Sequence, residues 1–475
     1  MRLHFESRRA SGARRKGPNV KRRTELGLLV LGSLIVVATY VLASIGTTSK
    51  IPPNLGPFLA IVLGLAVVAH IANRVLVPDA NPVLLPIATL LNGLGYVMIA
   101  VIDEHHAYPP QLQAAWTAVG IAMYVGTLVV VRRSRDLDRY RYILLLLAVF
   151  LMLSPLIPHL GESVAVRNGP SVRLFVKLGP ISGQPVELAK ILLCIFFASY
   201  FSEKQELLSI PTARLGNRLV IDPRPLVPIL MAWGLAMLVL AAERDVGFAL
   251  LIFVLFISML WLATGRGRYI VFGMGLFVVG AFAANKLFSQ VGERVANWLH
   301  PWTRFNLPGG SDQLVQGIYG LGTGGLVGTG LGFGQANLSR IPEVGSDYIF
   351  AAIGTEWGLL GTSLVVFAFV LMVGAGLRIA QKARSDFAKL LATGLTVILG
   401  MQAFFIMAGI VRLLPLTGIT LPFMAYGGSS LVANYVLIAL LMRISDEGER
   451  EAVAAEATAT PLVGKGAETD PSQAR

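Results

Sequence analysis

The chain has 475 residues, of which 55% are hydrophobic and only 14% are charged. Soluble globular domains carry about 25% charged residues, so this composition excludes a soluble globular protein and indicates one embedded in a membrane. The formal net charge of +13 is compatible with nucleic-acid binding, but basic residues that flank membrane spans are also expected from the positive-inside rule.

Twelve apolar stretches are long enough to cross a membrane as helices, because a crossing needs roughly 20 mostly apolar residues. They predict an all-α, polytopic transmembrane helical bundle of about 12 helices. In chain order the predicted spans are 26–44, 55–72, 83–102, 112–131, 142–160, 186–201, 225–241, 247–264, 268–286, 348–376, 390–411 and 428–443.

Basic residues are distributed unevenly over the predicted loops. If both termini are cytoplasmic, most Lys and Arg residues fall on the cytoplasmic side, which explains the net charge without nucleic acid. We expect residues 1–25 to form a basic, solvated cytoplasmic tail that can also contact anionic membrane lipid. Residues 446–475 are rich in Ala, Glu and Thr and poor in aromatic residues. A disordered cytoplasmic tail is expected there.

The long segment outside the membrane, residues 287–346, is rich in glycine. The alternating glycines of 328–334 loosely resemble a dinucleotide-binding fingerprint, but no strand precedes them and they lie on the extracellular side, so this interpretation is rejected. Cys194 lies in an apolar stretch and is expected to be a small buried side chain. One cysteine and scattered histidines predict no metal site.

Charged side chains at membrane depth cost at least about 2.5 kcal/mol each, which makes them candidates for function. Glu187 and Lys190 are three residues apart and could be a structural ion pair on one helix face. Asp245 and Asp347 could each cap a helix amino terminus. The common depth of these four residues and Arg412, at the outer ends of their helices, favours a shared polar cavity.

Glu356 lies nine residues into its predicted helix, roughly 13 Å along the axis at 1.5 Å per residue. At that depth a carboxyl group has to be protonated, paired or in contact with water. A structural or network role is expected for Glu356, and also for Asp245, which lies between two helices.

Four runs around these residues resemble the signatures of one known family, in the family's order. They are 178–190, which contains Gln184-Pro-Val-Glu187-Leu-Ala-Lys190; 243–247; 342–350 around Asp347; and 414–430. The chain thereby resembles the SEDS family (shape, elongation, division and sporulation; the RodA, FtsW and SpoVE proteins). Val186 stands in place of the family's serine, and Arg244 in place of a proline.

The resemblance implies a ten-helix transmembrane core at 83–445, including the extracytoplasmic loop 287–346. Residues 26–82 are then two additional N-terminal helices, and a twelve-helix form fits the elongation (RodA-type) branch. The implied activity is that of a peptidoglycan glycosyltransferase, which polymerises lipid II at the outer face of the bacterial cytoplasmic membrane with undecaprenyl pyrophosphate as leaving group. The implied partner is a class B penicillin-binding protein, which is a transpeptidase.

In such a reaction Asp347 is the expected general base for the acceptor hydroxyl. The negative charge of the departing pyrophosphate requires a cation. Candidates are Lys190, held by Glu187, together with Arg294, Arg340, Arg412, or a divalent cation such as Mg²⁺ or Mn²⁺.

Three other functions are alternatives. A lipid II flippase would use a similar polar cavity, but no convincing internal repeat is found and the carboxylates lie on one side instead of the midplane. A division-type (FtsW-like) polymerase would share the chemistry. A non-catalytic scaffold would leave the clustered charges without a function.

Overall fold

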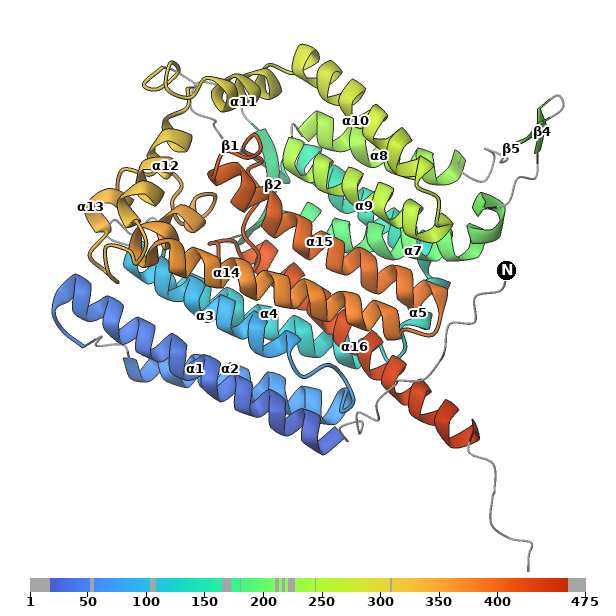
Figure 1. Cartoon of the computed structure of the whole chain (residues 1–475), viewed down its shortest axis with the longest axis horizontal. Coiled ribbons are helices and arrows are strands. Elements are labelled where there is room, and N and C mark those ends of the chain that lie inside the picture. Colours follow the sequence, from blue (N-terminus) through green and yellow to red (C-terminus); the bar gives the residue numbers. More distant parts are fainter. Residues whose placement is uncertain are drawn as a thin grey trace, which may run out of the picture.

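The computed structural model describes residues 18–51, 55–102, 108–164, 172–179, 181–209, 213–215, 218–220, 227–243, 245–307 and 310–459. Within these residues a helix occupies each of the twelve predicted spans, and the helices form one bundle (Figure 1). They are α1 (Pro18–Thr48), α2 (Leu55–Leu76), α3 (Leu84–Ile102), α4 (Pro110–Val130), α6 (Arg141–Leu153), α7 (Val186–Ser209), α8 (Val227–Glu243), α9 (Val246–Thr264), α10 (Arg268–Leu287), α14 (Ile349–Lys382), α15 (Asp386–Ile410) and α16 (Gly428–Ala459).

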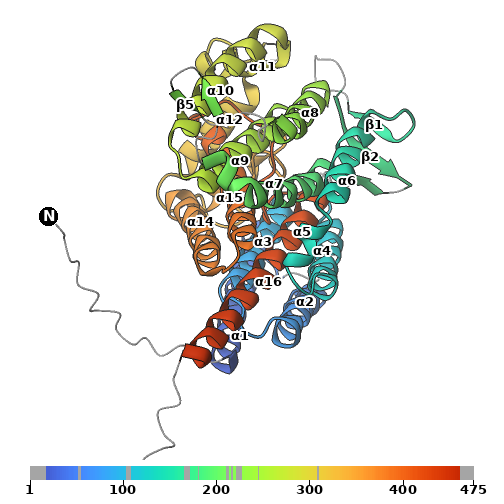
Figure 2. The same ribbon diagram turned by 90° about the vertical axis from the view of Figure 1, so that its right-hand side faces the viewer.

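Nine of the described helices are long and apolar enough to cross a membrane: α1, α2, α3, α4, α9, α10, α14, α15 and α16. Helices α6 and α8 are apolar but shorter, and α7 carries charged residues near both ends. Helix α7 packs against α6, α9 and α15, and Figure 2 shows α7, α9 and α15 in the middle of the bundle. The charges of its first turn, Glu187 and Lys190, are therefore surrounded by protein and not by lipid, whereas Glu203 near its other end is exposed.

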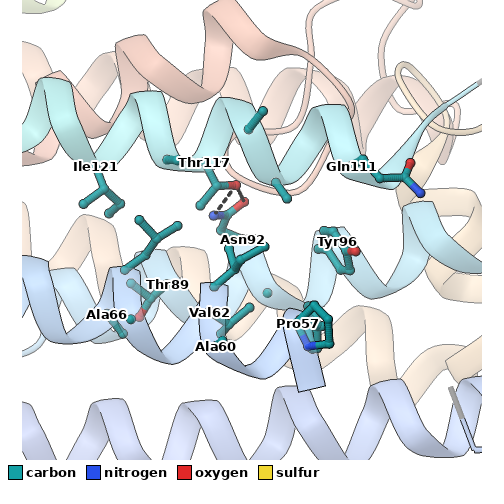
Figure 3. A pocket seen from close by; sticks show the side chains of 18 of the residues that line it. Pro57, Ala60, Val62, Ala66, Thr89, Asn92, Tyr96, Gln111, Thr117 and Ile121 are labelled. Atoms are coloured by element: carbon teal, nitrogen blue, oxygen red, sulfur yellow. Dashed lines mark hydrogen bonds between the residues drawn. The ribbon is translucent and has the colours of Figure 1, made fainter. Parts of the chain in front are cut away.

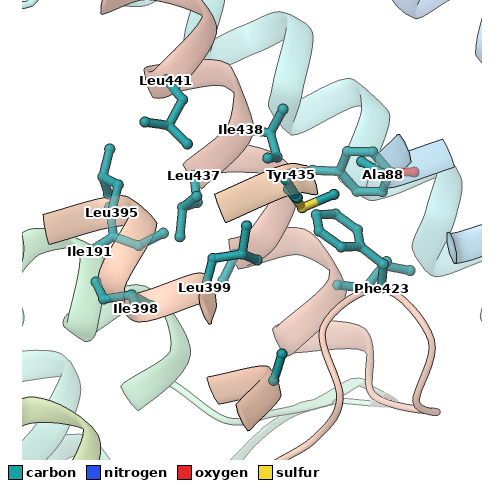
Figure 4. Close-up of a cluster of buried hydrophobic side chains, with 14 of the residues drawn as sticks. Ala88, Ile191, Leu395, Ile398, Leu399, Phe423, Tyr435, Leu437, Ile438 and Leu441 are labelled. Carbon is teal, nitrogen blue, oxygen red and sulfur yellow. The ribbon is translucent and has the colours of Figure 1, made fainter. Parts of the chain in front are cut away.

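The core is formed where α7, α15 and α16 meet (Figure 4). Ile191, Leu399 and Leu437 come from these three helices and are all buried. Glycines let the helices approach closely, since a Cβ atom at Gly394 would lie 2.5 Å from Cys194 Sγ. Cys194 is buried and free, as expected from the sequence.

Shorter elements lie beyond one end of the bundle, which we call the loop end (Figure 1). They are α11 (Ser289–Leu299), α12 (Asp312–Gly324), α13 (Gln335–Leu338) and the antiparallel strands β1 (Gly161–Val164), β2 (Val172–Leu178) and β3 (Ile181–Gly183). The opposite side of the fold has the turn helix α5 (Arg135–Arg139) and the hairpin of β4 (Ala213–Leu215) and β5 (Arg218–Val220).

Helix α14 is broken at Gly358, whose φ is +65°. The glycine-rich segment 325–334 fills the break: the N–H of Leu359 donates to the Gly325 carbonyl, and the N–H of Thr329 donates to the Thr355 carbonyl. An unbroken helix of 34 residues would measure about 51 Å, which exceeds the roughly 30 Å of hydrocarbon in a bilayer. The break therefore separates the loop-end part of α14, residues 349–357, from its spanning part.

The first turns of α1 and the last turns of α16 lie at the opposite end, which we call the terminal end. Lys21 and Glu449 form a salt bridge of 3.2 Å, and Lys382 also pairs with Glu449. Helix α1 thus begins where α16 finishes, which is the arrangement that an even number of crossings requires.

Three expectations are wrong in part. Helix α6 ends at Leu153, and after a short 3-10 turn at Ser154–Leu156 the chain enters β1, because Pro155 and Pro158 cannot extend a helix. Helix α16 continues to Ala459, so residues 446–459 are not disordered. Buried Asp446 explains this, since it accepts a hydrogen bond from the N–H of Asp79.

The third correction concerns the basic tail. Helix α1 already begins at Pro18, and Arg22 and Glu25 are buried there instead of solvated. They pair with each other, which offsets part of the cost of burying the two charges. Residues 1–17 and 460–475 lie outside the described residues.

Candidate functional site

Glu187 and Lys190 form an ion pair in the first turn of α7. The Lys190 ammonium group lies 2.5 Å from Glu187 Oε2 and donates a second hydrogen bond of 2.6 Å to Gln402 Oε1 in α15. All three side chains are at most 1% exposed. A buried pair is tolerated when further hydrogen bonds satisfy it, and Gln402 supplies one.

The run 414–430 connects this pair to the other family-like runs. Gln402 Nε2 donates to the Thr420 carbonyl at 3.0 Å, the N–H of Gln184 donates to Ser429 Oγ at 2.8 Å, and the N–H of Tyr426 donates to the Gly345 carbonyl at 2.9 Å. Gly247 packs so closely that a Cβ atom there would lie 2.5 Å from the Thr417 carbonyl oxygen. The four runs therefore converge at the loop end.

Asp245 caps a helix, which is the structural role that the sequence predicts as an alternative to a place in the polar cavity. Its side chain accepts a 3.0 Å hydrogen bond from the N–H of Phe248 and so caps α9, and Gln184 Nε2 donates to its other oxygen at 3.4 Å. Burial raises the pKa of Asp245 to about 6, against the cap hydrogen bond and the positive charge of Arg294, which both lower it.

Asp347 and Arg294 face each other across Gly418. The Arg294 side chain comes from α11 and donates from Nη1 to the Thr417 carbonyl at 2.9 Å. Gly418 is exposed and has a φ of +72°. A Cβ atom at Gly418 would lie 3.5 Å from Arg294 Nη2 and 3.9 Å from Asp347 Oδ2. Gly418 is therefore a solvent-exposed position that a carboxyl group and a guanidinium group flank, and we call it the opening at Gly418.

Asp347 is half-buried and precedes α14 without capping it, since the helix has Tyr348 at its N-cap and no side-chain cap. Burial, and then the negative charge of Glu343, raise the pKa of Asp347 to about 6, while Arg294 lowers it. A carboxyl group with such a pKa is largely deprotonated at neutral pH and is still a better proton acceptor than an ordinary aspartate.

We call Glu187, Lys190, Asp245, Arg294 and Asp347 the loop-end cluster. The two other arginines named from the sequence lie outside it. Arg412 donates from Nε and Nη2 to the carbonyls of Trp298 and Leu299, at 3.0 and 3.1 Å. It thereby satisfies the last turn of α11. Arg340 is exposed between α13 and α14.

Glu356 is buried and accepts hydrogen bonds from the backbone N–H groups of Gly332 and Gly334, the latter at 2.9 Å. Its carboxyl group is therefore paired with backbone donors of the glycine-rich segment. Pairing is one of the three states expected for a carboxyl group at this depth. This contact holds segment 325–334 against the broken part of α14.

Sequence reasoning missed Gln402, Glu343 and Gly418. Gln402 is an amide in the middle of an apolar span, a signal that marks interhelical hydrogen bonding. Glu343 lies four residues before Asp347, yet no pattern indicates that the two carboxyl groups interact. The importance of Gly418 becomes evident only when the residues beside it in the fold are known.

Among the described residues, no group of three or more His, Cys, Asp and Glu side chains could hold a metal ion. Mg²⁺ often uses one or two carboxylates together with substrate phosphates and water. Asp347 could serve in that limited way.

The fold and the cluster define a polytopic membrane protein with a partly open acid and arginine site at one end of its bundle. The model of the cell cycle protein family that comprises FtsW, RodA and SpoVE matches residues 83–450. The chain belongs to this family.

Its relatives include proteins of similar length. The chain is 37% identical over 457 residues to the peptidoglycan glycosyltransferase RodA of Mycobacterium tuberculosis, covering 94% of this chain and 95% of that one. It is 38% identical over 433 residues to RodA of Mycobacterium leprae, covering 90% of each chain.

Two solved structures share the fold. Thermus thermophilus rod shape determining protein RodA matches with a TM-score of 0.53 and 19% identity, over 78% of this chain and 97% of that chain. A chain from a peptidoglycan synthase complex that coordinates polymerization and crosslinking matches with a TM-score of 0.52 and 21% identity, over 82% of this chain and 97% of that chain.

Proposed function

We propose that this protein is a peptidoglycan glycosyltransferase that polymerises lipid II during cell elongation. The opening at Gly418, flanked by Asp347 and Arg294, carries the proposal. It combines a proton acceptor with a fixed cation, the two elements needed to form a glycosidic bond and release a pyrophosphate. The names and lengths of the RodA relatives favour the elongation branch. The FtsW-type relative from Thiomonas intermedia covers only 79% of this chain.

Asp347 accepts the proton of the acceptor hydroxyl as the bond to the anomeric carbon forms. Arg294 stabilises the charge that gathers on undecaprenyl pyrophosphate, and Arg340, which is exposed, can approach the same phosphates from the loop. A divalent cation, Mg²⁺ or Mn²⁺, would neutralise further charge if the pyrophosphate itself supplied most of its ligands.

Glu187 and Lys190 position other residues of the site and do not contact the substrate. Lys190 is 0% exposed and its donors point to Glu187 and Gln402. Through Gln402 this pair fixes Thr420, two residues beyond Gly418. Asp245 and Arg412 contribute in the same indirect way, by fixing the start of α9 and the end of α11.

The loop end faces the outside of the cytoplasmic membrane in this proposal, and both termini are cytoplasmic. The salt bridge between Lys21 and Glu449 supports a shared side for the two termini, and the positive-inside rule assigns that side to the cytoplasm. A reporter fused after Gly310 should read as external and one after Arg384 as cytoplasmic. The reverse result would place the site in the cytoplasm and exclude polymerisation outside.

The proposed partner is a class B penicillin-binding protein, which crosslinks the strands that this protein makes. The fold shared with a chain of a synthase complex supports a partner of this kind. Purified protein with that partner, incubated with labelled lipid II in detergent, should yield glycan polymer. Lipid II left unpolymerised by folded complex would overturn the proposal. Transport of lipid II across vesicle membranes in its place would favour a flippase.

A further inference from the structure

A groove lies in the membrane-spanning part of the fold, outside the loop-end cluster. It has a volume of about 680 Å³ and lies between α2, α3 and α4, with Tyr435 of α16 at its floor. We call it the α2 groove. Helix α2 belongs to residues 26–82, outside the 83–450 region that the family model matches, so the groove depends on an addition to that region.

The depth of the α2 groove matches one leaflet of a bilayer. Figure 3 shows Pro57, Tyr96 and Gln111 at one end and Ala66 and Ile121 at the other. Nine residues of α2 separate Pro57 from Ala66, which is roughly 14 Å at 1.5 Å per residue. One leaflet contributes about half of the roughly 30 Å of hydrocarbon. Gln111 follows Tyr108, whose hydroxyl donates to Glu343 at 3.2 Å, so the groove occupies the leaflet on the loop-end side.

The lining of the groove suits a hydrocarbon chain. Ala, Gly, Val, Leu and Ile residues form most of its walls. The polar side chains on its floor bond to one another: Asn92 Nδ2 donates to Thr117 Oγ1 at 3.1 Å (Figure 3). It also donates to the Tyr435 hydroxyl at 3.1 Å. Because those donors already have acceptors, an apolar ligand can cover them without leaving them unsatisfied.

The groove is also open toward the surrounding lipid. Ile61 is 42% exposed, and a Cβ atom at Gly64 would meet nothing within 4 Å. A lipid chain can therefore enter sideways from the bilayer without displacing a helix.

The floor of the groove continues into the segment that carries Gly418. The Tyr435 ring packs edge-on against Phe423, with ring centroids 5.4 Å apart. Gln113 Nε2 in α4 donates to the Ala425 carbonyl at 3.4 Å, and the backbone of Met424 lies against Gly95 of α3. Tyr435 thus borders both the groove and Phe423, five residues beyond Gly418, while neighbouring faces of α3 and α4 hold residues 424 and 425.

From this continuity we propose that the α2 groove binds the polyprenyl tail of the lipid-linked substrate while its pyrophosphate lies at the loop-end cluster. This inference rests on the proposed function, because only a lipid-linked substrate has a tail to place. The groove gives the additional helix α2 a role in substrate binding.

Photocrosslinking tests the occupant directly. The complex in nanodiscs is incubated with lipid II that carries a diazirine on its polyprenyl tail, and in parallel with phosphatidylglycerol that carries a diazirine on an acyl chain. The tail probe should label peptides from 55–66 and 111–121, and unlabelled lipid II should compete. Labelling confined to other helices, or equal labelling by phosphatidylglycerol that lipid II does not reduce, would overturn the proposal.

A matched pair of variants on α4 tests the same idea by kinetics. Ala118 lines the groove, whereas Val119 is exposed on the next face of α4 and does not. Ala118→Phe should raise the KM for lipid II about tenfold with little change in kcat, because it removes binding shared by ground state and transition state. Val119→Phe should leave KM unchanged, and equal KM values in both variants would contradict the proposal.

Gly64→Leu, on the opposite wall, provides a second variant if Ala118→Phe does not fold.

The groove proposal and the proposed enzyme activity can be refuted independently of each other. Wild-type complex that makes polymer without groove labelling refutes the groove and leaves the enzyme activity standing. Groove labelling without any polymer refutes the activity.

Discussion

Two clusters of buried charge lie at opposite ends of this bundle, and they differ in how completely they are closed. At the terminal end, Glu25 accepts hydrogen bonds from Arg22, His70 and Asn73, and Asn73 accepts one from Tyr124. At the loop end, Asp347 and Arg294 border the exposed Gly418. Buried charge alone therefore does not identify a reactive site.

The closed cluster has its own structural use. Arg22 also binds the Ala80 carbonyl, so the group ties α1 and α2 to the loop before α3 and to α4. Its members bond to one another and are all buried, at most 7% exposed. Turnover should depend on the open cluster, while the closed cluster should affect stability alone.

The largest expected effect belongs to Asp347. Asp347→Asn keeps the shape and hydrogen-bonding ability of the side chain but cannot accept a proton at neutral pH. Polymerisation should fall by roughly 100- to 10,000-fold, the usual loss when a general base is removed. Membrane level and co-purification with the penicillin-binding partner should stay normal, and Asp347→Glu should retain a little activity. Near-normal polymerisation by the Asn variant would contradict the assignment of Asp347 as the general base.

Glu187 should affect both stability and turnover. Glu187→Ala leaves Lys190 buried without its counter-ion, a change that typically costs about 3 to 5 kcal/mol. Folded yield, thermal stability in detergent and polymerisation should all fall. Exchanging the two residues, Glu187→Lys with Lys190→Glu, should restore part of the yield. Unchanged stability of the Glu187→Ala variant would show that the pair is unimportant.

Glu25 is the matched control at the terminal end. Glu25→Gln removes the counter-ion of buried Arg22 and should lower thermal stability by a similar amount, about 3 to 5 kcal/mol at most. Activity per folded molecule should remain within about twofold of the wild type, since no reacting group is touched. A large loss of specific activity would mean that the two clusters are coupled through the bundle.

The smallest expected effect is a shift in pH dependence. Since the pKa of Asp347 is raised to about 6, the carboxylate form is lost and polymerisation should decline as the pH falls through that value. Glu343→Gln removes a negative neighbour, lowers this pKa and should move the acid limb downward by roughly half a unit. Arg294→Gln should move it upward. Profiles of kcat/KM against pH measure both shifts. If neither variant moves the acid limb, the titration of Asp347 does not cause that limb.

Much of the fold follows from the sequence because membrane spans are long, continuous apolar runs. The twelve spans and the Glu187–Lys190 pair were predicted from residue spacing and apolar length alone. The resemblance supplied the four runs and the general-base hypothesis. Element ends were less certain where proline or buried polar contacts intervened, as at α6 and at the C-terminal half of α16.

Tertiary structure alone decided which charges meet and which remain accessible. Asp347 and Arg294 are 53 residues apart in sequence, and Gly418 is further still, so no local pattern indicates that they share one opening. The sequence predicts Arg22 and Glu25 as part of a solvated tail, because the partners of Glu25, His70 and Asn73, lie on another helix. Periodicity reports which face of a helix is apolar, whereas the contact between two polar faces depends on how the helices pack.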